Sequence, residues 1–173
     1  MEMRNESTYS APLLGWLKGG DVTAAWRDIG EGSIGDCRKS SFMRRGYLDD
    51  QFIQLEHLQD EANPNFVEEV VRLFYSDSVR LIQNIELAMI NKPNVDFGKL
   101  DAYMHQFKGS SSSIGAMKVM KECSKFREYC YAGNIEGCIK TFQLLKQEHA
   151  TLRRKLETYF QLVKQAGVVA ESA

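Results

Sequence analysis

From Tyr47 onward, apolar residues recur at steps of three and four, which is the spacing of one face of an α-helix. The first such run predicts a short helix from about residue 47, with Asp49 near the N-cap. The apolar positions of this helix are Leu48, Phe52, Leu55 and Leu58. Asn63 and Pro64 predict the start of a second helix, because asparagine is a good cap and proline fits the first turn.

Three further stripes follow the second helix, so the pattern predicts four longer helices in all. The second helix carries Val67, Val70, Phe74, Leu81, Ile85 and Ala88, and it stops at Asn91, Lys92 and Pro93. Asp96 can cap the third helix, and Gly115 ends or bends it. This helix carries Phe97, Leu100, Met104, Phe107, Ser111 and Ile114. The fourth helix ends at residues 132–134 and carries Val119, Cys123, Phe126 and Cys130. The last helix carries Ile135, Ile139, Phe142, Leu145, Leu152, Leu156, Tyr159 and Val163.

No strand pattern competes with these helices, and the loops between them are short. The sequence therefore predicts an all-α fold, an antiparallel four-helix bundle with an additional N-terminal helix packed on it. Residues 1–45 are rich in glycine and lack periodicity, which indicates a flexible or disordered N-terminal extension. We expect one helical domain over residues 46–167, followed by a C-terminal tail over residues 168–173.

Composition narrows the class of protein. The net charge of −1 does not favour nucleic acid as a partner, and no apolar run approaches the length of a membrane span. We therefore expect neither a nucleic-acid nor a membrane partner. The four cysteines form no CxxC pair and no zinc-binding spacing, which predicts reduced thiols of an intracellular protein, three of them in helices. They are Cys37, Cys123, Cys130 and Cys138.

The candidate chemistry lies in the third predicted helix. His105 is one residue from the buried stripe at Met104, so its ring should face mostly outward. Lys108 and Gly109 follow at offsets of three and four, which fall on the same helix face. A histidine that carries a phosphoryl group needs an exposed ring, a nearby cation and little bulk beside it. A neutral imidazole nitrogen can attack phosphorus, and Lys108 can meet the phosphoryl oxygens.

The face around His105 is unusually poor in large side chains for a helix surface. Besides Lys108 it holds Gly98, Asp101, Ala102, Gly109 and Ser112. A glycine inside a helix costs about 1 kcal/mol relative to alanine, so Gly109 needs a reason, and close approach by another protein is a physical one. We therefore predict this face as a partner-binding surface.

A simpler interpretation remains open for each histidine. A lone histidine on a helix is most often an ordinary surface or boundary residue, and His105 is distinguished only by Lys108, Gly109 and the small-residue face. His149 falls in the stripe of the last helix and is predicted to be a packed or boundary residue, whereas His57 should be exposed. The three are too scattered in sequence to indicate a metal site.

The chain offers no phosphate-binding loop for ATP and no convincing acidic cluster for Mg²⁺. A phosphoryl group on His105 would therefore have to come from one protein and pass to another. We expect no cofactor in the chain itself, with the partner supplying the metal.

Several motifs closely resemble those of plant histidine-containing phosphotransfer (HPt) proteins. They are His105–Ser111, Ser113–Ala116, Gly46–Asp49, Asp60–Phe66, Phe126–Cys130 and Ala132–Asn134. The resemblance covers about residues 46–167 and implies six helices, the last four forming the bundle. It implies that His105 carries a phosphoryl group from the receiver domain of a hybrid sensor histidine kinase to the aspartate of a response regulator, as in cytokinin signalling.

The resemblance also implies movement between cytoplasm and nucleus, and it leaves two functions to compare. The first is an active phosphorelay carrier, with sensor histidine kinases and response regulators as partners. The second is a helical adaptor that binds receiver domains without carrying phosphate and inhibits the relay, as relatives with asparagine at this position do. This chain keeps His105. Residues 1–45 depart from the family pattern, either as a true extension or through an upstream start, with Met43 as the alternative start.

Overall fold

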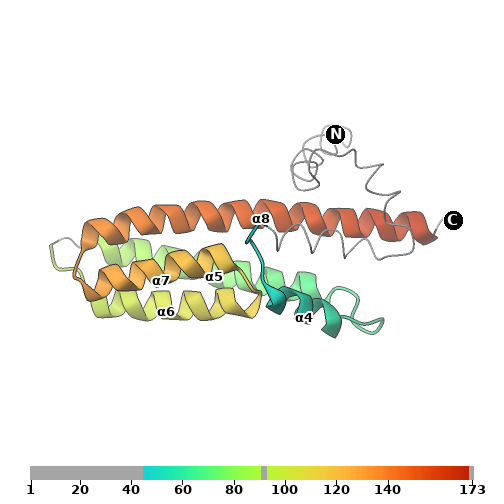
Figure 1. The fold of residues 1–173 in the computed structure, drawn as a ribbon, viewed down its shortest axis with the longest axis horizontal. Coiled ribbons are helices and arrows are strands. Elements are labelled where there is room, and N and C mark those ends of the chain that lie inside the picture. Colours follow the sequence, from blue (N-terminus) through green and yellow to red (C-terminus); the bar gives the residue numbers. More distant parts are fainter. Residues whose placement is uncertain (1–44, 91–92, 172–173) are drawn as a thin grey trace. The chain divides into compact units, whose positions relative to one another are not determined.

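A computed structural model describes residues 45–90 and 93–171, with side chains to residue 167 (Figure 1). The predicted extension over residues 1–45 lies outside this part of the chain, apart from Arg45. Every regular element within the described ranges is a helix. The helices are α4 (Asp50–Leu58), α5 (Phe66–Ile90), α6 (Phe97–Ser113), α7 (Met117–Tyr131) and α8 (Ile135–Glu171). The implied sixth helix is not among them.

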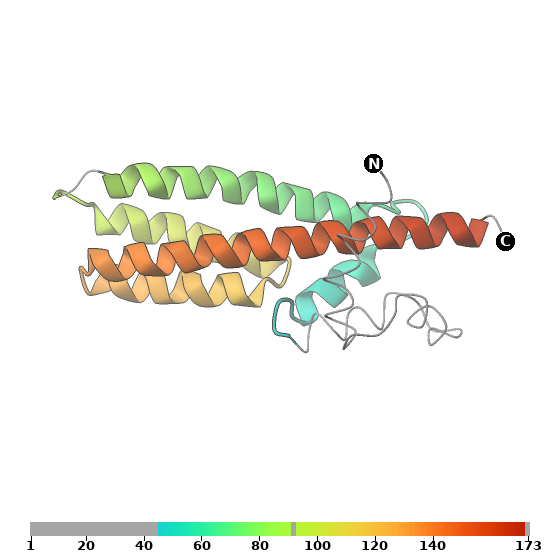
Figure 2. The ribbon, with the colours of Figure 1, turned by 90° about the horizontal axis from the view of Figure 1, so that it is seen from above.

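Helices α5, α6, α7 and the first half of α8 run alongside one another as a four-helix bundle (Figures 1 and 2). Helix α6 packs against both α5 and α7, and α4 packs against α5 and α6. The ring pair Phe126–Phe142 and the thiol pair Cys130–Cys138 join α7 to α8. The later residue of α7, Cys130, meets the earlier residue of α8, Cys138, so the two helices are antiparallel. The predicted all-α bundle with an added N-terminal helix is confirmed.

The predicted stripes form the core, with corrections at their margins. In α5 the buried position is Val71 rather than Val70, and Tyr75 and Ser78 are buried as well. Leu58 is 65% exposed because it is the last residue of α4. Val163 is also exposed, at 38%. The remaining predicted stripe positions are buried or half-buried.

Helix α5 begins at Phe66, two residues after Pro64, so the predicted cap at Asn63 is wrong. Asn63 is held in a preceding turn, where its N–H donates to the Asp60 carboxylate at 2.9 Å. The side chain of Gln59 acts in its place, since its Oε1 accepts the Val67 N–H at 3.2 Å.

Helix α8 is continuous from Ile135 to Glu171, past the predicted domain boundary at residue 167. The compact unit that contains the bundle extends to Leu152, and the rest of α8 belongs to a second compact unit. Within that part of the helix, Leu156 and Tyr159 are buried.

The turn between α6 and α7 holds the chain that leads into α4. Gly115 has a positive φ of 73°, and its carbonyl accepts the Asp49 N–H at 3.0 Å. The Tyr47 carbonyl accepts the Met117 N–H at 3.2 Å, and the ammonium of Lys118 lies 3.8 Å from the centre of the Tyr47 ring. Asp49 also caps α4, since its carboxylate accepts the Gln51 N–H at 2.9 Å.

Replacing Gly115 by alanine should destabilise the protein for two separable reasons. The positive φ alone costs about 1–3 kcal/mol for a residue with a side chain. A Cβ at Gly115 would also collide with the Asp49 carboxylate and meet the Phe52 backbone nitrogen at 3.2 Å. Gly133 is the matched control, because its φ is 63° and a Cβ there meets nothing within 4 Å. Chemical denaturation should show a larger loss for Gly115→Ala than for Gly133→Ala. Equal losses would contradict the role assigned to this turn.

Candidate functional site

The local structure of α6 fixes the direction of the His105 ring. Asp96 caps the helix by accepting the Lys99 N–H at 3.0 Å, which confirms the predicted cap. Met104 and Phe107 are both fully buried, whereas His105 is exposed. The rotation of about 100° per residue turns the imidazole out of the core. The predicted outward orientation of His105 is therefore confirmed.

Lys108 is half-buried and Gly109 is exposed, on the His105 side of α6. Burial raises the pKa of the Cys123 thiol in α7 to about 12, and the positive charge of Lys108 offsets part of this rise. The lysine therefore lies close to α7. Among the described residues, neither His105 nor Lys108 forms a side-chain hydrogen bond or an ion pair. Both side chains are available to an incoming anionic group.

The two glycines of the predicted partner-binding face differ in environment. A Cβ on Gly98 would lie 3.3 Å from the Asp96 carboxylate, so the N-cap gives Gly98 an internal reason to be small. A Cβ on Gly109 would meet nothing within 4 Å. Packing inside the protein therefore does not explain Gly109. Ala102 and Ser112, the other small residues of this face, are also exposed.

Asp101 lies one helical turn before His105, and its carboxylate is paired with Arg127 of α7. The Arg127 Nε donates to Asp101 Oδ1 at 2.7 Å, and its Nη2 lies 3.4 Å from Oδ2. This hydrogen bond raises the pKa of Arg127. Arg127 Nη2 also donates to the Tyr131 hydroxyl at 3.0 Å. The pair neutralises a negative charge that would otherwise stand beside an anion on His105.

Arg127 was missed as a site residue by sequence reasoning. It is far from His105 in sequence, and only the packing of α6 on α7 brings it next to Asp101. The one available signal was the Phe126–Cys130 motif, which was noted only as part of the family resemblance.

The serines that follow His105 are used by the helix itself. The Ser111 hydroxyl is buried and donates to the Phe107 carbonyl at 2.8 Å, and the Ser113 hydroxyl donates to the Ser110 carbonyl at 2.6 Å. Such bonds satisfy the hydroxyl within its own helix. Ser111 is thus a small core residue, as its place in the stripe predicted.

The other two histidines occupy different environments from that of His105. His149 is buried, with its Nε2 2.7 Å from the Ser78 hydroxyl and its ring packed against Phe74, Tyr75 and Phe107. His57 is exposed on α4. Both predictions are confirmed. No three metal-binding side chains converge anywhere in residues 45–90 and 93–171.

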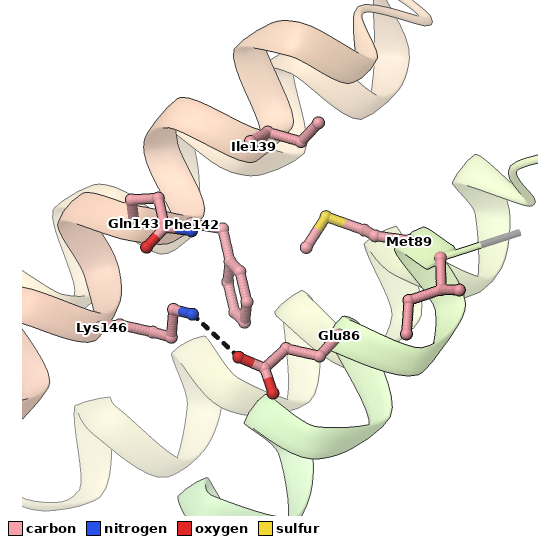
Figure 3. Close-up of a pocket in the computed structure, with 7 residues that line it drawn as sticks. Glu86, Met89, Ile139, Phe142, Gln143 and Lys146 are labelled. Atoms are coloured by element: carbon pink, nitrogen blue, oxygen red, sulfur yellow. Dashed lines mark hydrogen bonds and ion pairs between the residues drawn. The ribbon is translucent and has the colours of Figure 1, made fainter. Parts of the chain in front are cut away.

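A cleft of about 550 Å³ opens between the end of α5 and the beginning of α8 (Figure 3). Lys146 spans it, with its ammonium 2.8 Å from the Glu86 carboxylate and 5.0 Å from the centre of the Phe142 ring. Met89 and Ile139 supply apolar lining. None of the residues predicted from the sequence as site residues lines this cleft. The exposed face of α6 therefore remains the candidate site.

No helix in the described part of the chain is both long enough and apolar enough to cross a membrane.

Comparisons with known proteins agree with the geometry. The model of the Hpt domain family matches residues 69–155. Histidine-containing phosphotransfer protein 4 of Arabidopsis thaliana is 62% identical over 129 residues, which is 75% of this chain and 96% of that protein. Pseudo histidine-containing phosphotransfer protein 1 of rice is 60% identical over 123 residues, 71% of this chain and 65% of that protein. The crystal structure of a histidine-containing phosphotransfer protein from Medicago truncatula superposes with a TM-score of 0.71 at 42% identity, covering 76% of this chain and 88% of that one.

Proposed function

The chain belongs to the Hpt family of histidine-containing phosphotransfer proteins, and we propose that it is an active carrier in which His105 holds the phosphoryl group. The observation that carries the proposal is the placement of an exposed imidazole on α6 with Lys108 one turn away and open space beyond Gly109. Phosphorelay mediation is the function of the family.

The transfer step needs only groups that the two proteins would bring together. The lone pair of an imidazole nitrogen of His105 attacks the phosphorus of an aspartyl phosphate on a receiver domain. The new P–N bond forms as the P–O bond to the aspartate breaks, and the carboxylate leaves with the electron pair. The ring then loses its other N–H proton to solvent and becomes neutral. Transfer to a response regulator is the reverse reaction with a second aspartate. We propose that the receiver supplies the Mg²⁺.

Lys108 is proposed to stabilise the phosphoryl oxygens. Its position three residues after His105 lets the ammonium reach a group on the imidazole from the same side of the helix. A flexible ammonium is suited to follow the phosphorus as its oxygens move between acceptors. Arg127 assists indirectly, because it keeps the Asp101 carboxylate paired and directed toward α7.

The partner is proposed to dock on the small-residue face of α6. Gly98, Ala102, Gly109 and Ser112 are exposed around His105 and let another backbone or side chain approach the imidazole. Asp101, predicted as part of this face, is half-buried in its pair with Arg127 and therefore contributes less as a contact. Gly109 offers the clearest case for docking, since no internal contact requires it to be small.

A second candidate function is a receiver-binding adaptor that inhibits the relay. Rice proteins at 60%, 56% and 54% identity are named pseudo histidine-containing phosphotransfer proteins, so overall similarity does not separate the two functions. The presence of His105 with Lys108 favours the carrier. An adaptor would bind receiver domains with the same affinity whether or not position 105 could be phosphorylated.

Hybrid sensor histidine kinases and response regulators are the proposed partners, and cytokinin signalling in the cytoplasm and nucleus is the proposed setting. The plant origin of the similar proteins supports this placement. Incubation with a panel of phosphorylated plant receiver domains, including those of cytokinin receptors, would rank the donors by initial rate.

His105→Gln should abolish phosphoryl acceptance, because the amide of glutamine is not a nucleophile toward an aspartyl phosphate. The measurement is transfer of radiolabelled phosphate from a sensor-kinase receiver domain. His57→Gln is the matched control, since His57 is also exposed on a helix. It should accept phosphate at the wild-type rate. Equal labelling of the His105→Gln variant and the wild type would refute the assignment, and unchanged receiver binding without any labelling of the wild type would favour the adaptor.

Lys108→Ala should slow transfer while leaving the fold intact. Removing one charge-assisted contact costs about 1.5–3 kcal/mol, which corresponds to roughly one to two decades in rate. Lys121→Ala is the control, because Lys121 is an exposed lysine of α7. Single-turnover kinetics give both rates. If the two variants transfer alike, Lys108 is only a surface lysine.

Gly109→Gln should have opposite effects on stability and on docking. Glutamine is a better helix former than glycine by about 0.5 kcal/mol, so the melting temperature should hold or rise. The longer side chain should weaken receiver binding and transfer. Gly167→Gln is the matched control, because Gly167 is also an exposed helical glycine whose added Cβ meets nothing within 4 Å. Calorimetry beside a melting curve tests both effects. Normal binding by the Gly109 variant would exclude this face as the docking surface.

A further inference from the structure

Two thiols lie in contact across the α7–α8 hairpin, at a place that the phosphotransfer chemistry does not use. Cys130 is in the last turn of α7 and Cys138 in the first turns of α8, and their sulfurs are 3.8 Å apart. Both residues are buried, at 5% and 0% exposure. The turn between the helices, residues 132–134, is exposed and includes Gly133 with a positive φ of 63°.

We propose that Cys130 and Cys138 are a redox-active dithiol, which a hydroperoxide oxidises to a disulfide joining α7 to α8 within the folded bundle. The inference is independent of the phosphoryl transfer proposed above, because neither thiol belongs to the His105 face. It rests on the contact between the two sulfurs and on their position next to a short, exposed turn.

The reaction balances with the peroxide as the only oxidant. The Cys138 thiolate attacks one peroxide oxygen, the O–O bond breaks, and a sulfenic acid forms as water or an alcohol leaves. The Cys130 sulfur then attacks the Cys138 sulfur, the S–O bond breaks and water leaves. In total the two thiols lose two protons and two electrons, which reduce the O–O bond of the peroxide.

The environment of each sulfur supports this order. The hydrogen bond between the sulfurs lowers the pKa of Cys138 and raises the pKa of Cys130. We therefore assign the first attack to Cys138. Cys123 is the contrasting case, because no second thiol of the described residues is bonded to it and burial raises its pKa to about 12.

The sulfurs must approach from 3.8 Å to the disulfide length of about 2.05 Å. Both residues are close to helix ends, where local opening is easiest and where a small peroxide can enter. The left-handed Gly133 in the connecting turn gives the hairpin freedom to adjust. The bond would close a short loop over residues 130–138 and restrict the unfolded chain.

The test uses the full chain carrying Cys37→Ser, which removes a thiol outside the described residues. Reduced protein is treated with hydrogen peroxide, quenched with iodoacetamide, digested without reductant and analysed by mass spectrometry. We expect a peptide linked through Cys130 and Cys138, whereas Cys123 should be recovered as the alkylated thiol. The melting temperature of the oxidised protein should rise by several degrees and return after reduction. The far-ultraviolet circular dichroism should not change.

Cys123→Ser on the same background is the matched control, and it should form the linked peptide as fully as its parent. Cys138→Ser should protect Cys130 from peroxide, because the attacking thiolate is gone. The proposal is overturned if both thiols stay alkylated at peroxide concentrations that oxidise dithiothreitol, or if Cys123 is linked instead. It is also overturned if oxidation lowers the melting temperature, since the bond would then not fit the native bundle.

Discussion

The packing of α6 between α5 and α7 determines where His105 points, and the candidate chemistry depends on that packing. Leu100, Met104 and Phe107 are fully buried along one side of α6. Fully burying such side chains stabilises a protein by about 1.5–3 kcal/mol each, so the rotation of the helix about its axis is firmly set. A shift of one residue in this register would bury the imidazole and expose Met104. The site is therefore maintained by side chains that never touch a partner.

The same packing brings charged groups together that are remote in sequence. Asp101 and Arg127 are each about one-fifth exposed, so water screens their attraction less than it would at an open surface. Lys108 approaches α7 from the same side, close enough to act on Cys123. The surface around His105 thus combines an unpaired cation with a carboxylate that already has a partner. This arrangement is electrostatically suited to an anion on the imidazole.

Sequence reasoning was most successful where the determinants are local. The cap at Asp96 and the helix end at Gly115 depend on nearby residues and were predicted. So was the outward ring of His105, which follows from helical periodicity alone. The start of α5 was misplaced because the Asp60–Asn63 turn uses the residue that would have capped the helix. The role of Arg127 and the contact of Cys130 with Cys138 depend on helix packing, which no single-helix pattern specifies.

Helix α7 begins at Met117, its N-cap Ala116 forms no side-chain hydrogen bond, and backbone hydrogen bonds connect this end to the chain before α4. The Met117 N–H is bonded to the Tyr47 carbonyl, and the Asp49 N–H to the Gly115 carbonyl. These partners are far apart along the chain, so their contact closes a long loop and must offset the entropy of closing it. The Met117 N–H also lies 2.9 Å from the Gly115 carbonyl, so it keeps a local partner when the N-terminal segment is undocked. Amide exchange at Asp49, whose N–H donates across to the Gly115 carbonyl, therefore reports on the docking of the segment that leads into α4.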